Sequence, residues 1–156
     1  MCRIRLLTLL LCLVSILSCG YSFVLDGGTS KIRVSLEPSS NQTLLREAGM
    51  ILDSSLETAL DSMGMLAKDS QHSLQCTLVS SSRQGITSSS LSSDDRYRLN
   101  ISVSARITDA QGKKVWSSTF TDQGGYSEGG QPEDALDEAC TQVSLQIARA
   151  IASLSL

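Results

Sequence analysis

Three kinds of residue in this chain could carry chemistry: a single histidine, five cysteines and many serines. His72 and Cys76 lie four positions apart and could in principle share a metal ion. No further ligand stands near them, however, and a structural zinc site is almost always four-coordinate. No Gly-x-Ser-x-Gly motif surrounds any serine, and the histidine has no evident acidic partner. We therefore expect His72 to be exposed, Cys76 to be a core thiol, and the protein to be no enzyme, with no metal and no cofactor.

The most distinctive cysteine, Cys19, ends a hydrophobic leader. Met1–Arg5 holds two arginines and no acid, and Leu6–Leu17 is almost wholly apolar. This order is typical of a signal peptide, and the apolar run is shorter than the roughly 20 residues that a membrane span needs. Ile16–Cys19 resembles the bacterial lipobox, which implies cleavage after Ser18, a diacylglyceryl thioether on Cys19 and acylation of the new amino group.

Lipidation at Cys19 would make the membrane attachment permanent for practical purposes, because three acyl chains bind far more firmly than the single chain that is marginal alone. Gly20 stands where an Asp usually retains such lipoproteins in the inner membrane, which implies an outer-membrane address. The prediction is a lipoprotein signal peptide at 1–18, a lipidated tether at 19–30 and a periplasm-facing domain at 31–156. The alternative is a plain exported protein with an incidental cysteine.

The composition of the mature chain suits one tethered domain. The whole sequence has 13 basic and 16 acidic residues, and removing the two arginines of the leader brings the net charge to about −5. This balance gives no reason to expect nucleic acid as a partner. Only Cys76 and Cys140 remain besides Cys19, which excludes a scaffold held by many disulfides.

Alternating apolar residues predict four strands. The clearest is Tyr97–Asp109, which turns a polar row of Arg98, Asn100, Ser102, Ser104 and Arg106 away from an apolar row. A turn at 109–113 should join it to a hairpin partner. Serine-rich residues 80–95 and glycine-rich residues 124–130 read as loops. The strands are expected at Lys31–Glu37, Ser73–Ser80, Tyr97–Asp109 and Lys114–Asp122.

Two stretches have the three- and four-residue spacing of amphipathic helices. The first runs through residues 41–65, with Asn41 or Thr43 as N-cap and Gly64 near its end. The second starts at Pro132 and carries an apolar seam to Leu154. The order β-α-β-β-β-α predicts an α+β two-layer sandwich: a mixed four-stranded sheet with both helices on one face. The other face of the sheet should remain polar.

Cys76 and Cys140 are both expected to point into the space between sheet and helix. Because the periplasm is oxidising, they could form a disulfide that links the second strand to the last helix. Two buried, unpaired thiols are the other alternative.

Basic residues gather in the sequence around the predicted hairpin: Arg96, Arg98, Arg106, Lys113 and Lys114. Such a group could grip phosphates through charge-assisted hydrogen bonds. Ordinary solvated charges on a sheet edge explain the same pattern equally well.

The mature chain resembles the LptE family of lipopolysaccharide-assembly lipoproteins. The resemblance rests on Cys19–Phe23, Ile32–Val34, Asn41–Thr43, the hairpin sequence YRLNISVSARITDAQGKKVW and Gly125–Tyr126, followed by an alanine-rich final helix. It implies an outer-membrane lipoprotein that plugs the barrel of an LptD-like partner, assists its assembly and contacts lipopolysaccharide. A polar sheet face would suit a barrel lumen, which is itself polar. The basic hairpin residues would then be candidate contacts for lipid A phosphates.

A second class of function stays open alongside that resemblance. The chain could be a binding module of another envelope system, such as the pilot lipoprotein of a secretion channel or an activator of a cell-wall synthase. Such a protein would share the lipid anchor. Its stoichiometric partner would be a secretin or a synthase instead of a large barrel.

Overall fold

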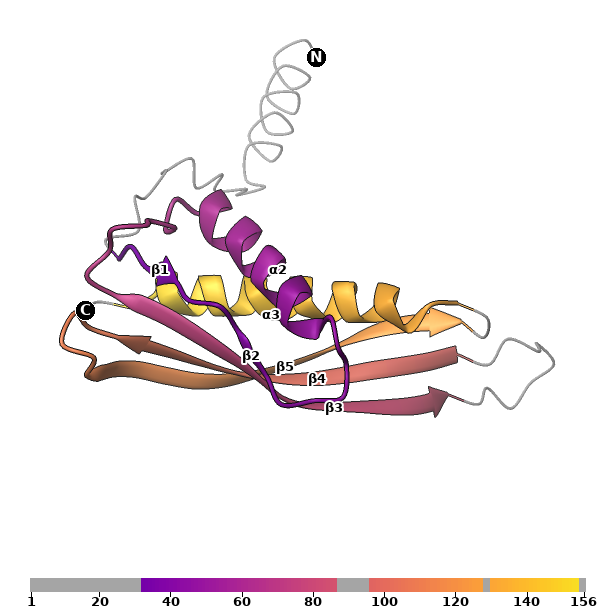
Figure 1. Ribbon diagram of the computed structural model, residues 1–156. Coiled ribbons are helices and arrows are strands. Elements are labelled where there is room, and N and C mark those ends of the chain that lie inside the picture. The colour runs from indigo at the N-terminus through magenta and orange to yellow at the C-terminus, as the bar shows by residue number, and fades with distance from the viewer. Residues whose placement is uncertain (1–31, 87–95, 128–129, 155–156) are drawn as a thin grey trace, which may run out of the picture.

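The computed structural model describes residues 32–86, 96–127 and 130–154. The predicted leader, Cys19 and the tether lie outside these residues. The described part contains two helices and a mixed sheet (Figure 1). In chain order the elements are β1 (Ser35–Leu36), β2 (Ser40–Asn41), α2 (Ala48–Ser62), β3 (Ser73–Ile86), β4 (Arg96–Thr108), β5 (Lys114–Ser127) and α3 (Pro132–Ala152).

The sheet has the order β1-β3-β4-β5, and β2 also pairs with β3. Of the three long strands, β4 is antiparallel to both β3 and β5, whereas the short strands β1 and β2 are parallel to β3. The first predicted strand, Lys31–Glu37, is therefore wrong in its extent: only two of its residues form β1, and pairing resumes after Pro38 as β2. Proline has no N–H to donate to the ladder, which is a physical reason for the interruption.

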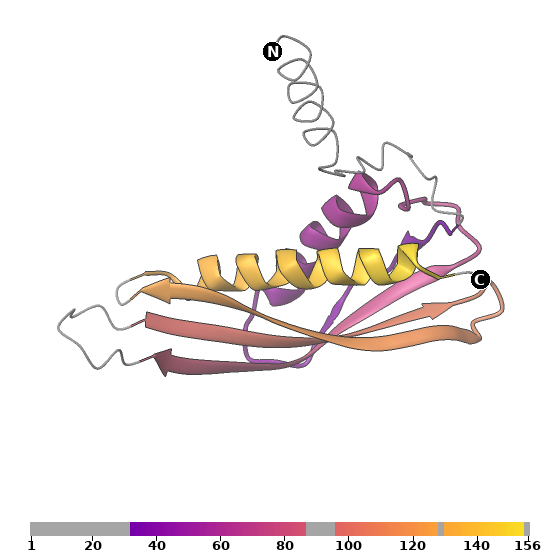
Figure 2. The same cartoon turned by 180° about the vertical axis from the view of Figure 1, so that it is seen from behind.

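Both helices lie on the same face of the sheet, as Figures 1 and 2 show from opposite sides. This confirms the predicted α+β class, the mixed sheet and the placement of the helices. We call the uncovered side the open face; it consists of the side chains of β3, β4 and β5 that point away from α2 and α3. A sheet with one apolar face needs only one covering layer, so the other face can stay polar.

The core lies between the sheet and the two helices. Alternate residues of β4, from Leu99 to Ile107, are buried as the alternation predicts. The predicted seams of both helices are buried as well, apart from Leu45, Met63 and Leu154, which are only partly buried. Leu45 also lies before the first residue of α2. The buried helical residues of these seams are Ala48, Leu52, Leu56 and Ala59 in α2, and Leu136, Cys140, Val143, Ile147 and Ile151 in α3.

β3 continues beyond its predicted end, and it contains a β-bulge at Val79. The pairing with β4 shifts between Leu78 and Ser80, so the inward residues are even-numbered before the bulge and odd-numbered after it. The prediction of a loop at 80–95 is therefore wrong for residues 80–86, which belong to β3. The bulge breaks the period-two pattern by which a strand is recognised. Residues 87–95 lie outside the described residues.

The hairpin between β4 and β5 has the predicted turn. The Oδ1 atom of Asp109 accepts hydrogen bonds from the N–H groups of Gln111 and Lys113, at 3.0 and 2.9 Å. Gly112 has φ of +75°, a conformation that a residue with a side chain rarely adopts. The side chain of Asp109 and the backbone freedom of Gly112 together close the turn.

β5 runs further than predicted, because Gly124 and Gly125 belong to the strand and not to a loop. A Cβ added to Gly124 would lie 1.9 Å from the carbonyl oxygen of Ala135 in α3. This glycine therefore allows the first turn of α3 to approach the sheet backbone closely. α3 itself begins at Pro132, as predicted, with Glu133 in its first turn.

The predicted N-cap of α2 is wrong. Asn41 lies in β2, where its Oδ1 accepts hydrogen bonds from the N–H and the hydroxyl of Thr43 at 2.9 and 2.8 Å. The helix starts later, with Glu47 as an N-cap that makes no side-chain capping bond. Its end agrees with the prediction, since Gly64 has φ of +66°. Neither α2 nor α3 is long and apolar enough to cross a membrane.

Candidate functional site

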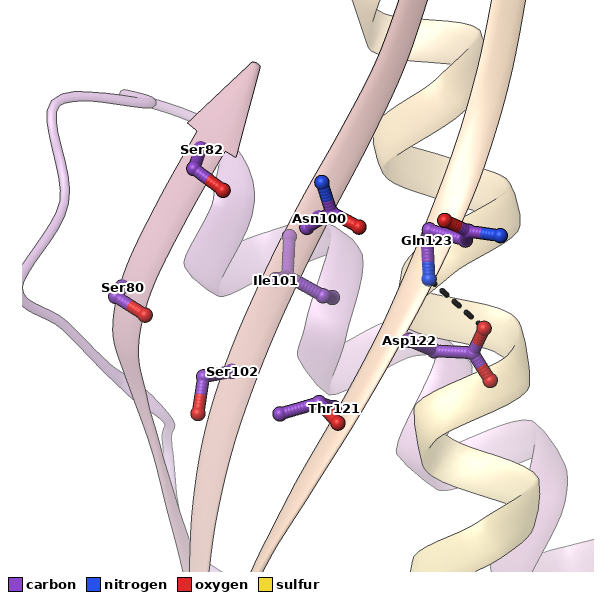
Figure 3. Close-up of a pocket in the computed structure, with 8 residues that line it drawn as sticks. All are labelled: Ser80, Ser82, Asn100, Ile101, Ser102, Thr121, Asp122 and Gln123. Atoms are coloured by element: carbon purple, nitrogen blue, oxygen red, sulfur yellow. Dashed lines mark hydrogen bonds between the residues drawn. The ribbon is translucent and has the colours of Figure 1, made fainter. Parts of the chain in front are cut away.

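The open face carries two hollows, and the larger is built from small neutral polar side chains. Its volume is about 440 Å³. In the register of the sheet, Ser80 lies beside Ser102 and Ser102 beside Thr121, while the next row contains Ser82, Asn100 and Gln123. Figure 3 shows these side chains rising from three adjacent strands. The residues that line the hollow are Ser80, Ser82, Asn100, Ile101, Ser102, Thr121, Asp122 and Gln123.

The chemistry of this larger hollow is hydrogen bonding without charge. Hydroxyls and carboxamides both donate and accept, so they can match a ligand or protein surface rich in hydroxyl and amide groups. The one acid at its rim, Asp122, is already engaged: its Oδ1 accepts from the N–H of Gln123 at 2.8 Å (Figure 3), and its Oδ2 from Nε2 of Gln146 in α3 at 2.7 Å. Nothing in this hollow resembles a nucleophile with a base.

The smaller hollow, of about 280 Å³, carries positive charge. Arg106 and Lys114 both line it, together with Gln75, Thr77, Ser104 and Ser117. Arg106 is exposed and donates a hydrogen bond from Nη2 to Oε1 of Gln75. Two cations with neutral donors around them are a suitable surface for a phosphate or carboxylate.

The structure divides the five predicted basic residues between the two ends of the hairpin. Arg98 and Arg106 share the open face, as predicted, but eight residues of strand separate them, or about 26 Å at 3.3 Å per residue. Lys113 is exposed in the turn near Arg106 and Lys114. Arg96 begins β4 at the far end, and its side chain lies outside the described residues. A single small anion could not touch all five.

One arrangement that the sequence did not reveal lies on the helix-facing side, at the end of the sheet. The guanidinium carbon of Arg83 is 4.2 Å from the ring centroid of Tyr97 and 5.2 Å from that of Tyr126. The two rings stack with centroids 5.3 Å apart. Arg83 reaches them only because the bulge at Val79 turns it to the helix-facing side. A parity count that ignores the bulge places Arg83 on the open face.

The weak metal candidate formed by His72 and Cys76 is not supported. Cys76 is fully buried in the core, whereas His72 is half-buried and its backbone carbonyl accepts a hydrogen bond from the N–H of Ser35 at 2.8 Å. The sequence predicted an exposed His72, and this prediction is wrong because the residue is half-buried. Among residues 32–86, 96–127 and 130–154, no group of three or more His, Cys, Asp or Glu side chains could hold a metal ion.

Of the two alternatives for Cys76 and Cys140, the structure has the unpaired one: both are free and buried. Burial, with a smaller contribution from the carboxylate of Asp53, raises the pKa of the Cys76 thiol to about 12. Burial and then Asp137 raise the pKa of the Cys140 thiol to about 12 as well. Both groups should therefore stay protonated at neutral pH, and a thiol is a poor nucleophile in that form.

Cys76 and Cys140 are expected to resist iodoacetamide in the folded protein at about pH 8 and to react once urea unfolds it. Both the raised pKa and the lack of access act in this direction. Mass spectrometry of the peptides that contain each cysteine measures the extent of alkylation. Rapid labelling of either residue in the folded protein would contradict this assignment.

Comparison with known proteins supplies the family. The sequence model of the family described as "LptE: Lipopolysaccharide-assembly" matches residues 33–151. No curated protein matches the chain.

Several solved structures share the fold. A minor lipoprotein from Acinetobacter baumannii has a TM-score of 0.54 at 21% identity, over 78% of this chain and 92% of that one. The PelC dodecamer from Paraburkholderia phytofirmans has a TM-score of 0.56 at 15% identity, over 81% and 91%. A hypothetical protein from Chlamydia trachomatis has a TM-score of 0.56 at 9% identity, over 78% and 96%. At these identities the likeness concerns the fold alone.

The family match spans nearly all of the described domain, from just before β1 to the last turn of α3. It agrees with the resemblance noted in the sequence and with the expectation that the protein is not an enzyme. The chain belongs to the LptE family of non-enzymatic lipopolysaccharide-assembly lipoproteins.

Proposed function

We propose that this protein is anchored to the outer membrane through acyl chains on Cys19 and works inside the barrel of an LptD-like partner during lipopolysaccharide transport. One observation carries this proposal: a long sheet leaves one face uncovered, and that face is polar along three strands. Side chains such as Ser102 and Asn100 can exchange hydrogen bonds with the polar lumen of a barrel. An apolar face could not be left in that environment without cost.

Within this role, we assign contact with lipopolysaccharide phosphates to the smaller hollow of the open face. Arg106 and Lys114 line the same 280 Å³ space, and Lys113 lies one residue from it in the turn. Arginine can contact a phosphate through two parallel N–H donors, while lysine adds a compact charge. Arg98 stands too far along β4 to join them.

Replacing both Arg106 and Lys114 by Glu is expected to weaken binding of purified lipopolysaccharide at least tenfold, or about 1.4 kcal/mol. The double change removes two donors and adds repulsion toward phosphate. Surface plasmon resonance on the detergent-solubilised protein at fixed ionic strength gives the dissociation constants. Arg98→Glu is the matched control, because it reverses a charge on the same strand and face, about 26 Å away. Equal losses in the two variants, or none in either, would remove the smaller hollow from the site.

The identity of the bound partner distinguishes the alternative role, in another envelope system, from the role proposed above. Co-purification of the acylated protein from membranes should yield a large outer-membrane barrel in equal amount. A secretin or a cell-wall synthase in its place would favour the alternative and would overturn the barrel assignment.

A further inference from the structure

The layer formed by α2 and α3 carries acidic side chains almost without basic ones. The two helices contain a single basic residue, Arg149, in the last turn of α3. Several of the acids stand four positions apart on the same helix, such as Glu57 and Asp61, and like charges at this spacing destabilise a helix. The acids of the two helices are Asp53, Glu57, Asp61, Glu133, Asp134, Asp137 and Glu138.

Contacts within the molecule account for some of these acids but not for Asp137. Glu133 and Asp134 lie in the first turn of α3, where they complement the helix dipole, and this effect falls off beyond that turn. The carboxylates of Asp53 and Glu138 each accept a hydrogen bond from a backbone N–H, at 2.9 and 3.0 Å. Asp137 is exposed, and no hydrogen-bond donor or cation of the described residues pairs with it.

Asp137 lines a hollow of about 210 Å³ between α2 and α3, which we call the inter-helix hollow. Most of the residues around it carry a hydroxyl group, and none of them is basic. It is lined by Ser54, Ser55, Thr58, Ala59 and Ser62 from α2, and by Asp137, Thr141 and Leu145 from α3. Both helices lie on the side of the sheet opposite the open face (Figures 1 and 2), so this hollow is separate from the two hollows described above.

The hydroxyls of the inter-helix hollow are arranged mainly as hydrogen-bond acceptors. Ser55, Thr58 and Ser62 each donate to a backbone carbonyl of α2, at 2.9, 2.9 and 2.8 Å. Because each hydroxyl hydrogen is used within the helix, each oxygen keeps lone pairs for another donor. The carboxylate of Asp137 adds two further acceptor oxygens and a negative charge. The hollow is therefore complementary to a group that donates hydrogen bonds and is positively charged.

We infer that the inter-helix hollow is a docking site for a lysine side chain of a partner protein. An ammonium group has three donors and no acceptor, so it matches hydroxyl oxygens and a carboxylate. The apolar stem of the lysine would pack against Ala59 and Leu145, which also line the hollow. Arginine is a poorer match, because its rigid planar fork suits paired acceptors, whereas a compact ammonium can turn its donors toward scattered oxygens.

The acids around the hollow favour a basic partner surface before contact is made. Asp61 and Asp134 are both exposed, and a surface of one sign steers an oppositely charged partner during encounter. The basic hollow of this chain, with Arg106 and Lys114, lies on the open face instead. The sheet would thus meet phosphates while the helices meet a basic protein surface. The inference holds whether or not that partner is the barrel of the proposed function.

Zero-length cross-linking tests this contact. A carbodiimide joins a carboxylate to an amine that touches it, as an amide, with the loss of water. In the full-length protein isolated from membranes with its bound partner, Asp137 should become linked to a lysine of that partner, and mass spectrometry of the linked peptides identifies both residues. Asp137→Asn should abolish this link. Glu57→Gln should leave it unchanged, because Glu57 is exposed on α2 but does not line the hollow. A complex that forms normally without a link at Asp137 would overturn the inference.

Charge reversal measures what the contact contributes to binding. Asp137→Lys should lower the amount of co-purified partner about tenfold over a series of salt concentrations, since it sets like charges face to face. Glu57→Lys makes the same change in charge outside the hollow and should stay within about twofold of the unaltered protein. Both positions are exposed on helices, so circular dichroism should show that both variants fold. Equal losses in the two variants would contradict a specific site at the hollow.

The cross-link also separates this inference from the proposed function. A link from Asp137 to a lysine of a secretin or a cell-wall synthase would support the docking site and overturn the barrel assignment. A large barrel that co-purifies in equal amount, but is never linked to Asp137, would support the proposed function and overturn the docking site.

Discussion

Gly124→Ala is expected to destabilise the protein by about 3 kcal/mol, at the upper end of what overpacking usually costs. The added methyl group would lie 1.9 Å from the carbonyl oxygen of Ala135 and within 2.8 Å of its Cα and carbonyl carbon. These are backbone atoms in the first turn of α3, so no side-chain rotation can relieve the clash. Either α3 or β5 must move, and the packing between them is lost. Urea unfolding followed by circular dichroism measures the change in the free energy of unfolding.

Gly125→Ala is the matched control for that experiment. It is the next residue of the same strand, but it is exposed, and the nearest atom to an added Cβ is the carbonyl oxygen of Tyr97 at 3.9 Å. The same chemical change should therefore alter the free energy of unfolding by no more than about 0.5 kcal/mol. If the two variants unfolded at the same urea concentration, the close approach of α3 to Gly124 would not be what stabilises the fold there.

Leu56→Ala is expected to cost about 2–5 kcal/mol, because it removes three carbons from a fully packed core and leaves a cavity. Leu56 has no exposed surface and belongs to the face of α2 that is buried in the core. The expected loss is a large part of the about 5–15 kcal/mol by which a domain is usually stable. The measurement is again the free energy of unfolding in urea, for each variant against the unaltered protein.

Leu44→Ala is the matched control, because it makes the same substitution at an exposed position. Leu44 is 99% exposed, so the same three carbons are lost from a side chain already surrounded by water. Its effect should stay within about 0.5 kcal/mol. A large loss at Leu44 would show that this residue is covered in solution, and a small loss at Leu56 would show that α2 does not pack as described.

The family assignment and the open face are two separate grounds for the proposed function. The match over residues 33–151 shows the family, and the uncovered sheet face shows which surface is free to meet a partner. The larger hollow is neutral and the smaller one is basic. The proposed role would use both surfaces, since the protein would lie against the polar lumen of a barrel and also contact phosphates.

Local patterns in the chain were sufficient for the fold class, the course of β4 and the two helical seams. The reason is that β4 alternates without interruption from Tyr97 to Thr108 and is covered on one face only, so its pattern reports burial directly. The turn at Asp109 is equally local, because its hydrogen bonds join residues at most four positions apart. The same holds for the start of α3 at Pro132.

The features that the sequence pattern could not predict depend on contacts between different elements of the fold. The bulge at Val79 shifts the parity of β3, and only pairing with β4 reveals that residues 80–86 continue the strand. The sequence predicts a loop at Gly124, whereas the packing of the following helix is what excludes a side chain there, through the backbone of Ala135. The five basic residues look like one cluster in the sequence, yet a rigid strand of about 3.3 Å per residue holds Arg98 and Arg106 far apart. Residue spacing along the chain determines which side of an element is buried, whereas the pairing of strands and the seating of helices determine which side chains meet.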